Sequence, residues 1–347
     1  MATDSHKSSE AEETDANCPV PEKTKEFKQF DIVTNCSDHH FIWLNKPSKD
    51  GLNCDQLKIM QEWKILEQNL PESIFVRVYE ERIDLLRAAI IGAAGTPYHD
   101  SLFFFDLAFP SDYPNQPPKV HYHSHNLSLN PNLYSGGYVC LSLLNTWSGK
   151  KTQKWNPSQS TILQVLLSLQ ALVLNEKPYF NEPGVNPGRP IWEKESMEYT
   201  EDVFLLSCKT MLCLLEKPPQ NFEDFVAEHF RHRAEVILTA CKAYTDGVVR
   251  VGYFYVDEGS SSSSTVEVSR KFKLSMQKLF PDLVEAFARN GASVWNYFKP
   301  TRKKMISSKD RAIAKKKKYK FTRNLIGKWK WMLGLKKFRK KLRSTAV

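Results

Sequence analysis

Four short apolar runs follow one another between residues 73 and 123, separated by turn-forming segments. They read SIFVRVY, DLLRAAIIG, SLFFFDLAF and PPKVHYH. The first run alternates apolar and polar residues as a half-buried strand does, and the turn GAAGTPYHD joins the second run to the third. The fourth begins with two prolines, which cannot donate to a β-ladder, so we expect an edge strand there. This order predicts an antiparallel meander of four strands.

Helical patterns lie on both sides of these runs. Residues 54–70 place apolar side chains at steps of three or four, and Pro71 helps to stop that helix. Further helices are predicted over residues 158–174, about 200–215 and about 221–243. A run of strands followed by a run of helices favours an α+β domain over an alternately wound one.

The two ends of the chain differ from its middle in charge. The first 26 residues are acidic and polar with almost nothing to bury, so we expect them to be disordered. They lack an apolar segment after a basic start and do not resemble a secretory signal. From Lys299 onward the chain holds 20 Lys and Arg against Asp310, although the whole chain carries only +10. An acidic body therefore carries a basic tail, and each needs its own explanation.

Several classes of protein are disfavoured by simple spacing rules. The longest nearly apolar run, residues 162–174, is too short to span a bilayer, which needs about 20 apolar residues. The seven cysteines are odd in number and form no Cys-x-x-Cys pair, which favours reduced thiols in the cytosol or nucleus. The segment SGKKT at 148–152 resembles the end of a phosphate-binding loop, but the required earlier glycine would fall on Leu144.

Three histidines, His121, His123 and His125, alternate along the fourth strand-like run and would share one face of an extended strand. A zinc site could use that geometry. No cysteine or carboxylate accompanies them at ligand spacing, so we favour solvated or hydrogen-bonding histidines. We therefore predict neither a metal nor a cofactor.

Cys140 has two interpretations. A free cysteine is among the most often buried residues, and Cys140 follows an apolar pair, which favours a packing role. However, its surroundings are rich in Asn, Pro, Gly and Ser, and a chain reversal at Gly136-Gly137 would bring the amide of Asn132 beside the sulfur. An amide next to a cysteine is a recognisable oxyanion donor for acyl or thioester chemistry. A Cys-His hydrolase would also need a histidine base, and none of the three histidines is marked as its partner.

Several segments, in order, resemble the ubiquitin-conjugating enzymes. PYHDSLFFFDLAFPSDYPNQPPKVHYHS is similar to their strand-and-loop segment, and NPNLYSGGYVCLSLL to their active-site segment. The spacing of eight from Asn132 to Cys140 matches the family, and WNPSQSTILQVLLSLQALV resembles its crossover helix. The resemblance covers about residues 54–245. It implies the ubiquitin-conjugating (UBC) fold: an N-terminal helix, the four-stranded meander and then C-terminal helices.

The resemblance also implies a chemistry. Cys140 would accept the C-terminal carboxyl of ubiquitin as a thioester and pass it to a lysine of a protein substrate. Asn132 would stabilise the oxyanion or hold the active-site loop. A separate activating enzyme would consume ATP, which agrees with the missing nucleotide site. The implied partners are ubiquitin, the activating enzyme, a protein substrate and, in some members, a ubiquitin ligase.

The sequence departs from the common family pattern at two places. Asn130 stands where the family usually has a histidine that braces the loop. The segment WSGKKTQKW at 147–155 inserts residues between the cysteine and the crossover helix. The acidic residue that orients the incoming lysine would lie in KPYFNEPG at 177–184, and either Glu182 or Asn181 could serve.

With these departures the sequence resembles a large subclass of the family. It contains plant phosphate-signalling-type members, hybrid conjugating-ligase enzymes and the giant BIR-repeat protein. The segments LNEKPYFNEPG and FEDFVAEHF resemble the plant type most. By analogy the subclass implies built-in, ligase-like selection of substrates. The inserted Lys150, Lys151 and Lys154 would then steer an acidic substrate or contact ubiquitin, or form an ordinary solvated loop.

The resemblance divides the chain into regions. They are a disordered acidic N-terminus (1–26), an N-terminal extension (27–53), the catalytic domain (54–245), a C-terminal extension (246–298) with a Ser-rich loop (260–264), and the basic tail (299–347).

The basic tail has several interpretations of its own. RAIAKKKKYKF at 311–321 is typical of a nuclear-localisation cluster or a nucleic-acid patch. Residues 322–343 place Trp and Leu at helical steps with lysines opposite, which favours a helix on an anionic membrane or on a partner. We expect a cytoplasmic or nuclear protein, with peripheral membrane association as a further option. The rival function is a catalytically silent scaffold carrying this tail, but silent variants normally lack the cysteine.

Overall fold

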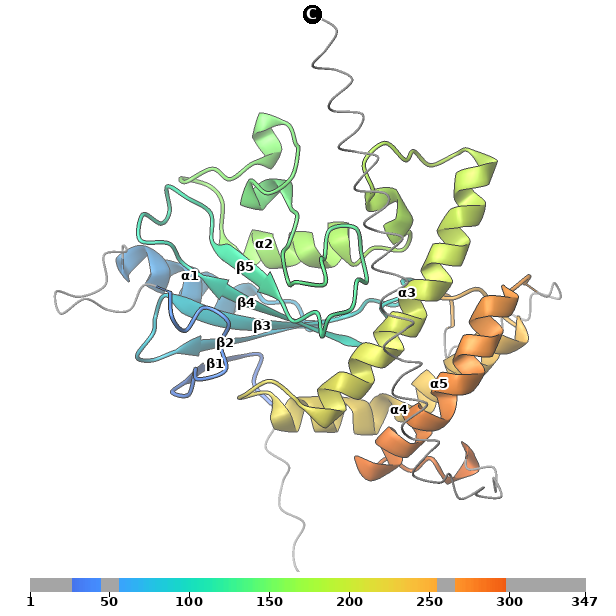
Figure 1. Cartoon of the computed structure of the whole chain (residues 1–347). Coiled ribbons are helices and arrows are strands. Elements are labelled where there is room, and N and C mark those ends of the chain that lie inside the picture. Colours follow the sequence, from blue (N-terminus) through green and yellow to red (C-terminus); the bar gives the residue numbers. More distant parts are fainter. Residues whose placement is uncertain (1–26, 45–55, 255–265, 298–347) are drawn as a thin grey trace, which may run out of the picture. The chain divides into compact units, whose positions relative to one another are not determined.

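A five-stranded sheet forms the centre of the computed structural model, which describes residues 27–44, 56–254 and 266–297 (Figure 1). The strands lie in chain order across the sheet: β1 (Phe30–Val33), β2 (Ile74–Tyr79), β3 (Leu85–Ile91), β4 (Leu102–Ala108) and β5 (Lys119–Tyr122). Strands β2 to β5 pair antiparallel, with Arg77 opposite Arg87 and Arg87 opposite Asp106. The predicted meander and the α+β class are confirmed.

The fifth strand, β1, comes from the N-terminal extension and was not predicted. It pairs parallel with β2, with Phe30 opposite Val76 and Val33 opposite Tyr79. A strand of four residues is too short to show an alternation of apolar and polar residues in the sequence. It forms because it can pair with the backbone of β2. The four-stranded prediction is therefore one strand short.

One face of the sheet carries the main core and packs against α1 (Gln56–Asn69) and α2 (Ile162–Ser168). A π-helical turn, η3 (Leu169–Val173), continues α2. The helices and the sheet contribute fully buried apolar side chains: Ile59, Leu66, Val76, Val78, Phe103, Phe105, Ile162, Val165, Leu166 and Leu169. Each such side chain stabilises the fold by about 1.5–3 kcal/mol relative to exposure, so this layer fixes the crossover helix on the sheet.

A buried carboxylate joins α1 to the start of α2. Glu62 accepts a hydrogen bond from the Tyr113 hydroxyl at 2.7 Å and another from the backbone N–H of Ile162 at 2.9 Å. The second bond satisfies a free donor at the N-terminus of α2, where a negative charge is also favoured. Thr161 caps the same end by accepting from the N–H of Gln164. The start of α2 is therefore anchored on α1.

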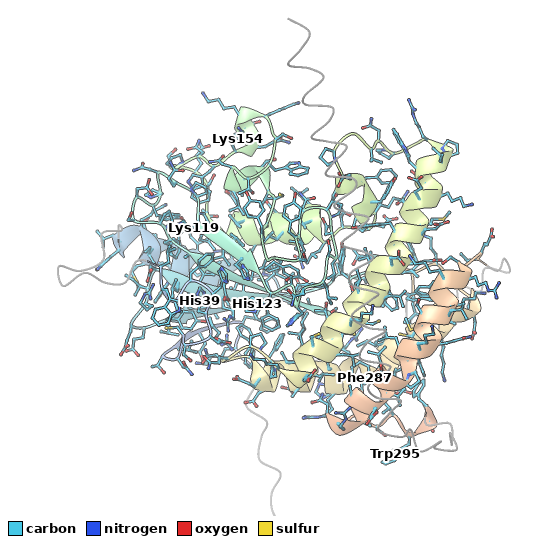
Figure 2. The ribbon with its side chains drawn as sticks, viewed as in Figure 1. His39, Lys119, His123, Lys154, Phe287 and Trp295 are labelled. Carbon is cyan, nitrogen blue, oxygen red and sulfur yellow. The ribbon has the colours of Figure 1, made fainter. Side chains whose placement is uncertain are left out.

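The other face of the sheet is covered by residues of the N-terminal extension and by the start of α4 (Glu223–Asp246). At its centre Arg87 donates to Asp106 through Nε at 2.6 Å and through Nη2 at 3.0 Å. His123 Nε2 lies 3.0 Å from the same carboxylate, and the backbone N–H of His40 donates to it at 2.7 Å. Although burial opposes it, these partners hold the pKa of Asp106 well below its usual range. Figure 2 shows His39 and His123 close together over this part of the sheet.

Three long helices complete the described chain: α3 (Pro190–Glu216), α4 and α5 (Arg270–Arg289) (Figure 1). Helix α5 is a single helix that continues through Pro281. Its buried side chains lie on both sides of that proline and face α3 and α4: Phe272, Met276, Leu279, Leu283, Val284 and Phe287. Burial of this continuous face outweighs the lost backbone hydrogen bond at the proline.

Some predictions concern segments that lie outside the described residues. These are the acidic N-terminus (1–26), the Ser-rich loop (260–264) and the basic tail from residue 299, including the predicted helix over 322–343. Within the part that the structure does describe, no helix has the length and apolar character needed to cross a membrane.

Candidate active site around Cys140

A tight hairpin delivers Cys140 to Asn132. The backbone N–H of Gly137 donates to the carbonyl of Tyr134 at 2.8 Å, and the N–H of Tyr134 donates to the carbonyl of Tyr138 at 3.0 Å. Gly137 has φ +84°, a left-handed conformation that glycine adopts without strain. After the turn the N–H of Cys140 donates to the carbonyl of Asn132 at 2.9 Å. The reversal predicted at Gly136-Gly137 therefore forms.

The side chain of Asn132 holds the backbone of the cysteine. Its Nδ2 donates to the carbonyl oxygen of Cys140 at 2.8 Å, and the residue is 7% exposed. The Oδ1 atom is buried and has no hydrogen-bond partner among the described residues. Because an amide carries two N–H bonds, one donor remains beyond the bond to the Cys140 carbonyl. The amide thus lies next to the sulfur-bearing residue.

Asn130 braces the loop at the position where the family usually has a histidine. The residue is 1% exposed. Its Nδ2 donates to the Tyr98 hydroxyl at 2.9 Å and to the carbonyl of Val173 at 2.6 Å. Its Oδ1 accepts from the backbone N–H of Asn132 at 2.8 Å. A buried asparagine can therefore connect the loop to the segment between β3 and β4 and to the end of the crossover helix, since it both donates and accepts.

Asn181 lies behind the same loop, at the end of η4 (Pro178–Asn181). Its Nδ2 donates to Oδ1 of Asn130 at 3.2 Å, and its Oδ1 accepts from Asn175 at 2.7 Å. The structure thus places this predicted candidate in the hydrogen-bond network that braces the loop.

Cys140 is 3% exposed as a residue, and its thiol lies beside the phenol of Tyr134. Burial raises the pKa of the Cys140 thiol, and the hydrogen bond to the Tyr134 hydroxyl opposes part of that rise. Tyr134 was not predicted as a site residue, although it stands only two positions after Asn132. The parallel stacking of its ring on Tyr138, with centroids 5.8 Å apart, holds it in place.

Glu182 follows η4 directly and is exposed. Burial first, then the hydrogen bond to Cys140 and the negative charge of Glu182, raise the pKa of the Tyr134 phenol. The carboxylate therefore lies within electrostatic reach of the phenol that contacts the thiol. Cys140 and Asn132, predicted from one stretch, and Glu182, predicted from another, are brought to one region.

The predicted histidines support the hairpin from its other side. A Cβ atom at Gly137 would come within 2.0 Å of the His121 ring, so the ring packs directly against the turn. The His121 ring also stacks on His40, with centroids 3.4 Å apart. Ser124 Oγ donates to the carbonyl of Ser135 at 2.6 Å.

Among the described residues, no group of three or more His, Cys, Asp or Glu has the geometry to hold a metal ion.

Comparison with known proteins agrees with this geometry. Residues 58–205 match the family described as ubiquitin-conjugating enzyme. The putative ubiquitin-conjugating enzyme E2 38 of Arabidopsis thaliana is 50% identical over 274 residues, which cover 77% of this chain and 82% of that protein. The chain belongs to the ubiquitin-conjugating enzyme family. The family and the UBC fold inferred from the sequence are both confirmed.

Other relatives are much longer than the part that matches. The probable ubiquitin-conjugating enzyme E2 24 of Arabidopsis thaliana is 55% identical over 273 residues, covering 76% of this chain but 29% of that protein. The human dual E2 ubiquitin-conjugating enzyme/E3 ubiquitin-protein ligase BIRC6 is 36% identical over 241 residues, covering 64% of this chain and 5% of that protein. The chain thus spans less than a third of the length of these two relatives. The predicted likeness to the plant members and to the BIR-repeat protein is confirmed.

Proposed function

We propose that this chain carries ubiquitin as a thioester on Cys140 and transfers it to lysines of protein substrates. The observation that carries the proposal is a buried cysteine whose backbone carbonyl accepts from the Asn132 amide and whose thiol is hydrogen-bonded to the Tyr134 hydroxyl. Membership of the ubiquitin-conjugating enzyme family supports the same chemistry.

Loading would begin with ubiquitin held as a thioester on the activating enzyme. Cys140 loses its proton to solvent and attacks the thioester carbonyl, and the thiolate of the activating enzyme leaves. Because burial raises the pKa of Cys140, the free protein keeps the thiol protonated.

Transfer would follow by attack of an uncharged substrate amine on the Cys140 thioester. The tetrahedral intermediate carries an oxyanion, and the remaining N–H of Asn132 would donate to it. An amide bond forms, the Cys140 thiolate leaves, and the amine releases its second proton to solvent. Glu182 would orient the incoming lysine by charge attraction before it is deprotonated.

The partners implied by this reaction are ubiquitin, an activating enzyme and a protein substrate. The name of the human relative BIRC6 describes a dual conjugating enzyme and ligase. We extend this to the present chain as ligase-like selection of substrates within the same polypeptide, with a separate ligase as the alternative arrangement.

A charging assay tests the function. The full chain is incubated with an activating enzyme, ATP and ubiquitin, and the products are separated with and without reductant. We expect an adduct that a thiol reductant removes and that Cys140→Ala abolishes. Cys36→Ala and Cys213→Ala, which alter two half-buried thiols elsewhere, should charge normally. Failure of the wild type to charge would favour the silent scaffold instead.

A further inference from the structure

The chain segment that carries Cys140 lacks acidic side chains. No Asp or Glu occurs from Tyr113 to Asn175, a stretch that includes β5, the Cys140 hairpin, the inserted loop and α2. The inserted loop carries Lys150, Lys151 and Lys154. We propose that these lysines bind acidic side chains that flank the acceptor lysine of the substrate. The inference rests on the proposed function, because it assigns a class of substrate to the same site.

The loop is anchored, so its lysines have a defined position. Ser142, two residues after Cys140, donates through Oγ to the carbonyl of Ser148 at 2.9 Å. A short helical turn, η2 (Lys151–Gln153), follows, and Oε1 of Gln153 accepts from the N–H of Lys150 at 2.8 Å. The lysines therefore belong to a segment that is hydrogen-bonded to Ser142, close to Cys140 in the sequence.

The far end of the loop is fixed by Trp155. Its ring is 8% exposed and packs near Tyr113, and its Nε1 donates to the carbonyl of Pro114 at 2.7 Å. Figure 2 shows Lys154 on this loop, on the side of the view opposite to α5, and Lys119 at the start of β5 on the same side. The loop and the segment before β5 are thus joined by a buried aromatic anchor.

The lysines of the loop are exposed, and no carboxylate of the described residues pairs with Lys150, Lys151 or Lys154. Lys177, by contrast, pairs with Glu193 at 2.9 Å. The positive charge of the loop is therefore available to a partner. Because each exposed ion pair contributes little to the affinity, the three lysines act mainly by raising the rate of encounter.

Glu182 gives the site a charge of the opposite sign. Its carboxylate acts on Tyr134, which precedes Cys140 in sequence and whose hydroxyl contacts the thiol, whereas the basic loop follows Cys140. A substrate lysine would be attracted to Glu182, and acidic residues beside it to the basic loop. The charge pattern therefore fits an acceptor lysine with Asp or Glu neighbours better than one in a neutral or basic segment.

The test uses the full chain, charged with ubiquitin and then separated from the activating enzyme. Its discharge is followed on two peptides of equal length, one with Asp and Glu around a single lysine and one with Ser and Gln instead. We expect the wild type to discharge about tenfold faster to the acidic peptide at about 0.05 M salt, and nearly equally at about 0.5 M. The variant Lys150→Gln/Lys151→Gln/Lys154→Gln should charge normally and lose this preference.

A matched variant removes the same charge elsewhere. Lys209→Gln/Arg270→Gln/Lys278→Gln alters three exposed residues on α3 and α5 and should keep the preference. Equal discharge of the wild type to both peptides overturns the inference while leaving the proposed function intact. Slower charging of the loop variant also overturns it, because the loop would then serve loading and not the substrate. Failure of the wild type to charge overturns the proposed function and the inference with it.

Discussion

Asn130 and Asn132 are joined by a hydrogen bond of 2.8 Å, from the backbone N–H of Asn132 to Oδ1 of Asn130. Asn132 in turn donates to the carbonyl of Cys140, so two hydrogen bonds through Asn132 connect Asn130 to the cysteine. Both residues are nearly buried. The position of the cysteine therefore depends on a side chain ten residues earlier that never contacts the sulfur-bearing residue directly.

Removal of this brace should destabilise the protein. Asn130→Ala leaves the Asn132 N–H without its acceptor and removes the donor to the Tyr98 hydroxyl, both in buried surroundings, and the Val173 carbonyl keeps only the longer bond from Asn181. We expect the free energy of unfolding to fall by about 2–3 kcal/mol, measured by urea denaturation. Asn115→Ala alters an exposed asparagine whose side chain forms no recorded bond, and should change it by less than about 0.5 kcal/mol. Equal effects of the two variants would refute the brace.

The hydroxyl of Tyr134 should increase the reactivity of Cys140. Tyr134→Phe removes the hydrogen bond that opposes the rise in the pKa of Cys140, so burial acts alone and the thiolate fraction falls. A neutral hydrogen bond contributes about 0.5–1.5 kcal/mol, which predicts about threefold slower alkylation by iodoacetamide at about pH 8. Peptide mass spectrometry reports the rate at Cys140 itself.

Tyr138→Phe is the matched control for that change. Tyr138 stacks on Tyr134 but is 52% exposed, and its hydroxyl is not among the groups that shift the pKa of Cys140. Its removal should leave the alkylation rate unchanged. An unchanged or faster rate in Tyr134→Phe would show that the hydroxyl does not stabilise the thiolate.

The sequence predicted the parts of the site that depend on local order, and missed those that depend on pairing across the fold. The turn at Gly136-Gly137 and the spacing from Asn132 to Cys140 are local, and both features lead to the observed contact. Asn130 was noted only as a missing histidine, because its partners Tyr98 and Val173 lie about 30 and 40 residues away in sequence. Strand β1 was not predicted for the same reason, because it forms by pairing with β2, which is distant in the sequence.

Acidification should destabilise the protein through His121. Burial first, then the neighbouring His40 and His123, lower the pKa of His121 from 6.5 to about 4, although Asp106 opposes them. The unfolded chain therefore binds more protons than the folded one between these two values, so stability falls as pH drops from about 6.5 towards 4. Because the ring is partly exposed, we expect about 1 kcal/mol from this residue and not the full effect of the shift.

Urea denaturation at about pH 7 and about pH 5 measures this contribution. His121→Gln should lose less stability between the two pH values than the wild type does. His232→Gln, at an exposed position on α4, should behave like the wild type. A wild-type pH dependence retained in His121→Gln would mean that other groups account for the loss.

A methyl group at Gly137 should disrupt the hairpin that carries Tyr134 and leads to Cys140. Gly137 has φ +84°, and its Cβ would come within 2.0 Å of His121, so Gly137→Ala combines backbone strain with a clash. We expect a loss of about 2 kcal/mol or more and slower charging with ubiquitin. Gly136→Ala meets nothing within 4 Å and should cost under about 0.5 kcal/mol. Adding His121→Ala to Gly137→Ala should restore only part of the loss, because the strained φ remains. Equal stability of the two glycine variants would contradict this packing.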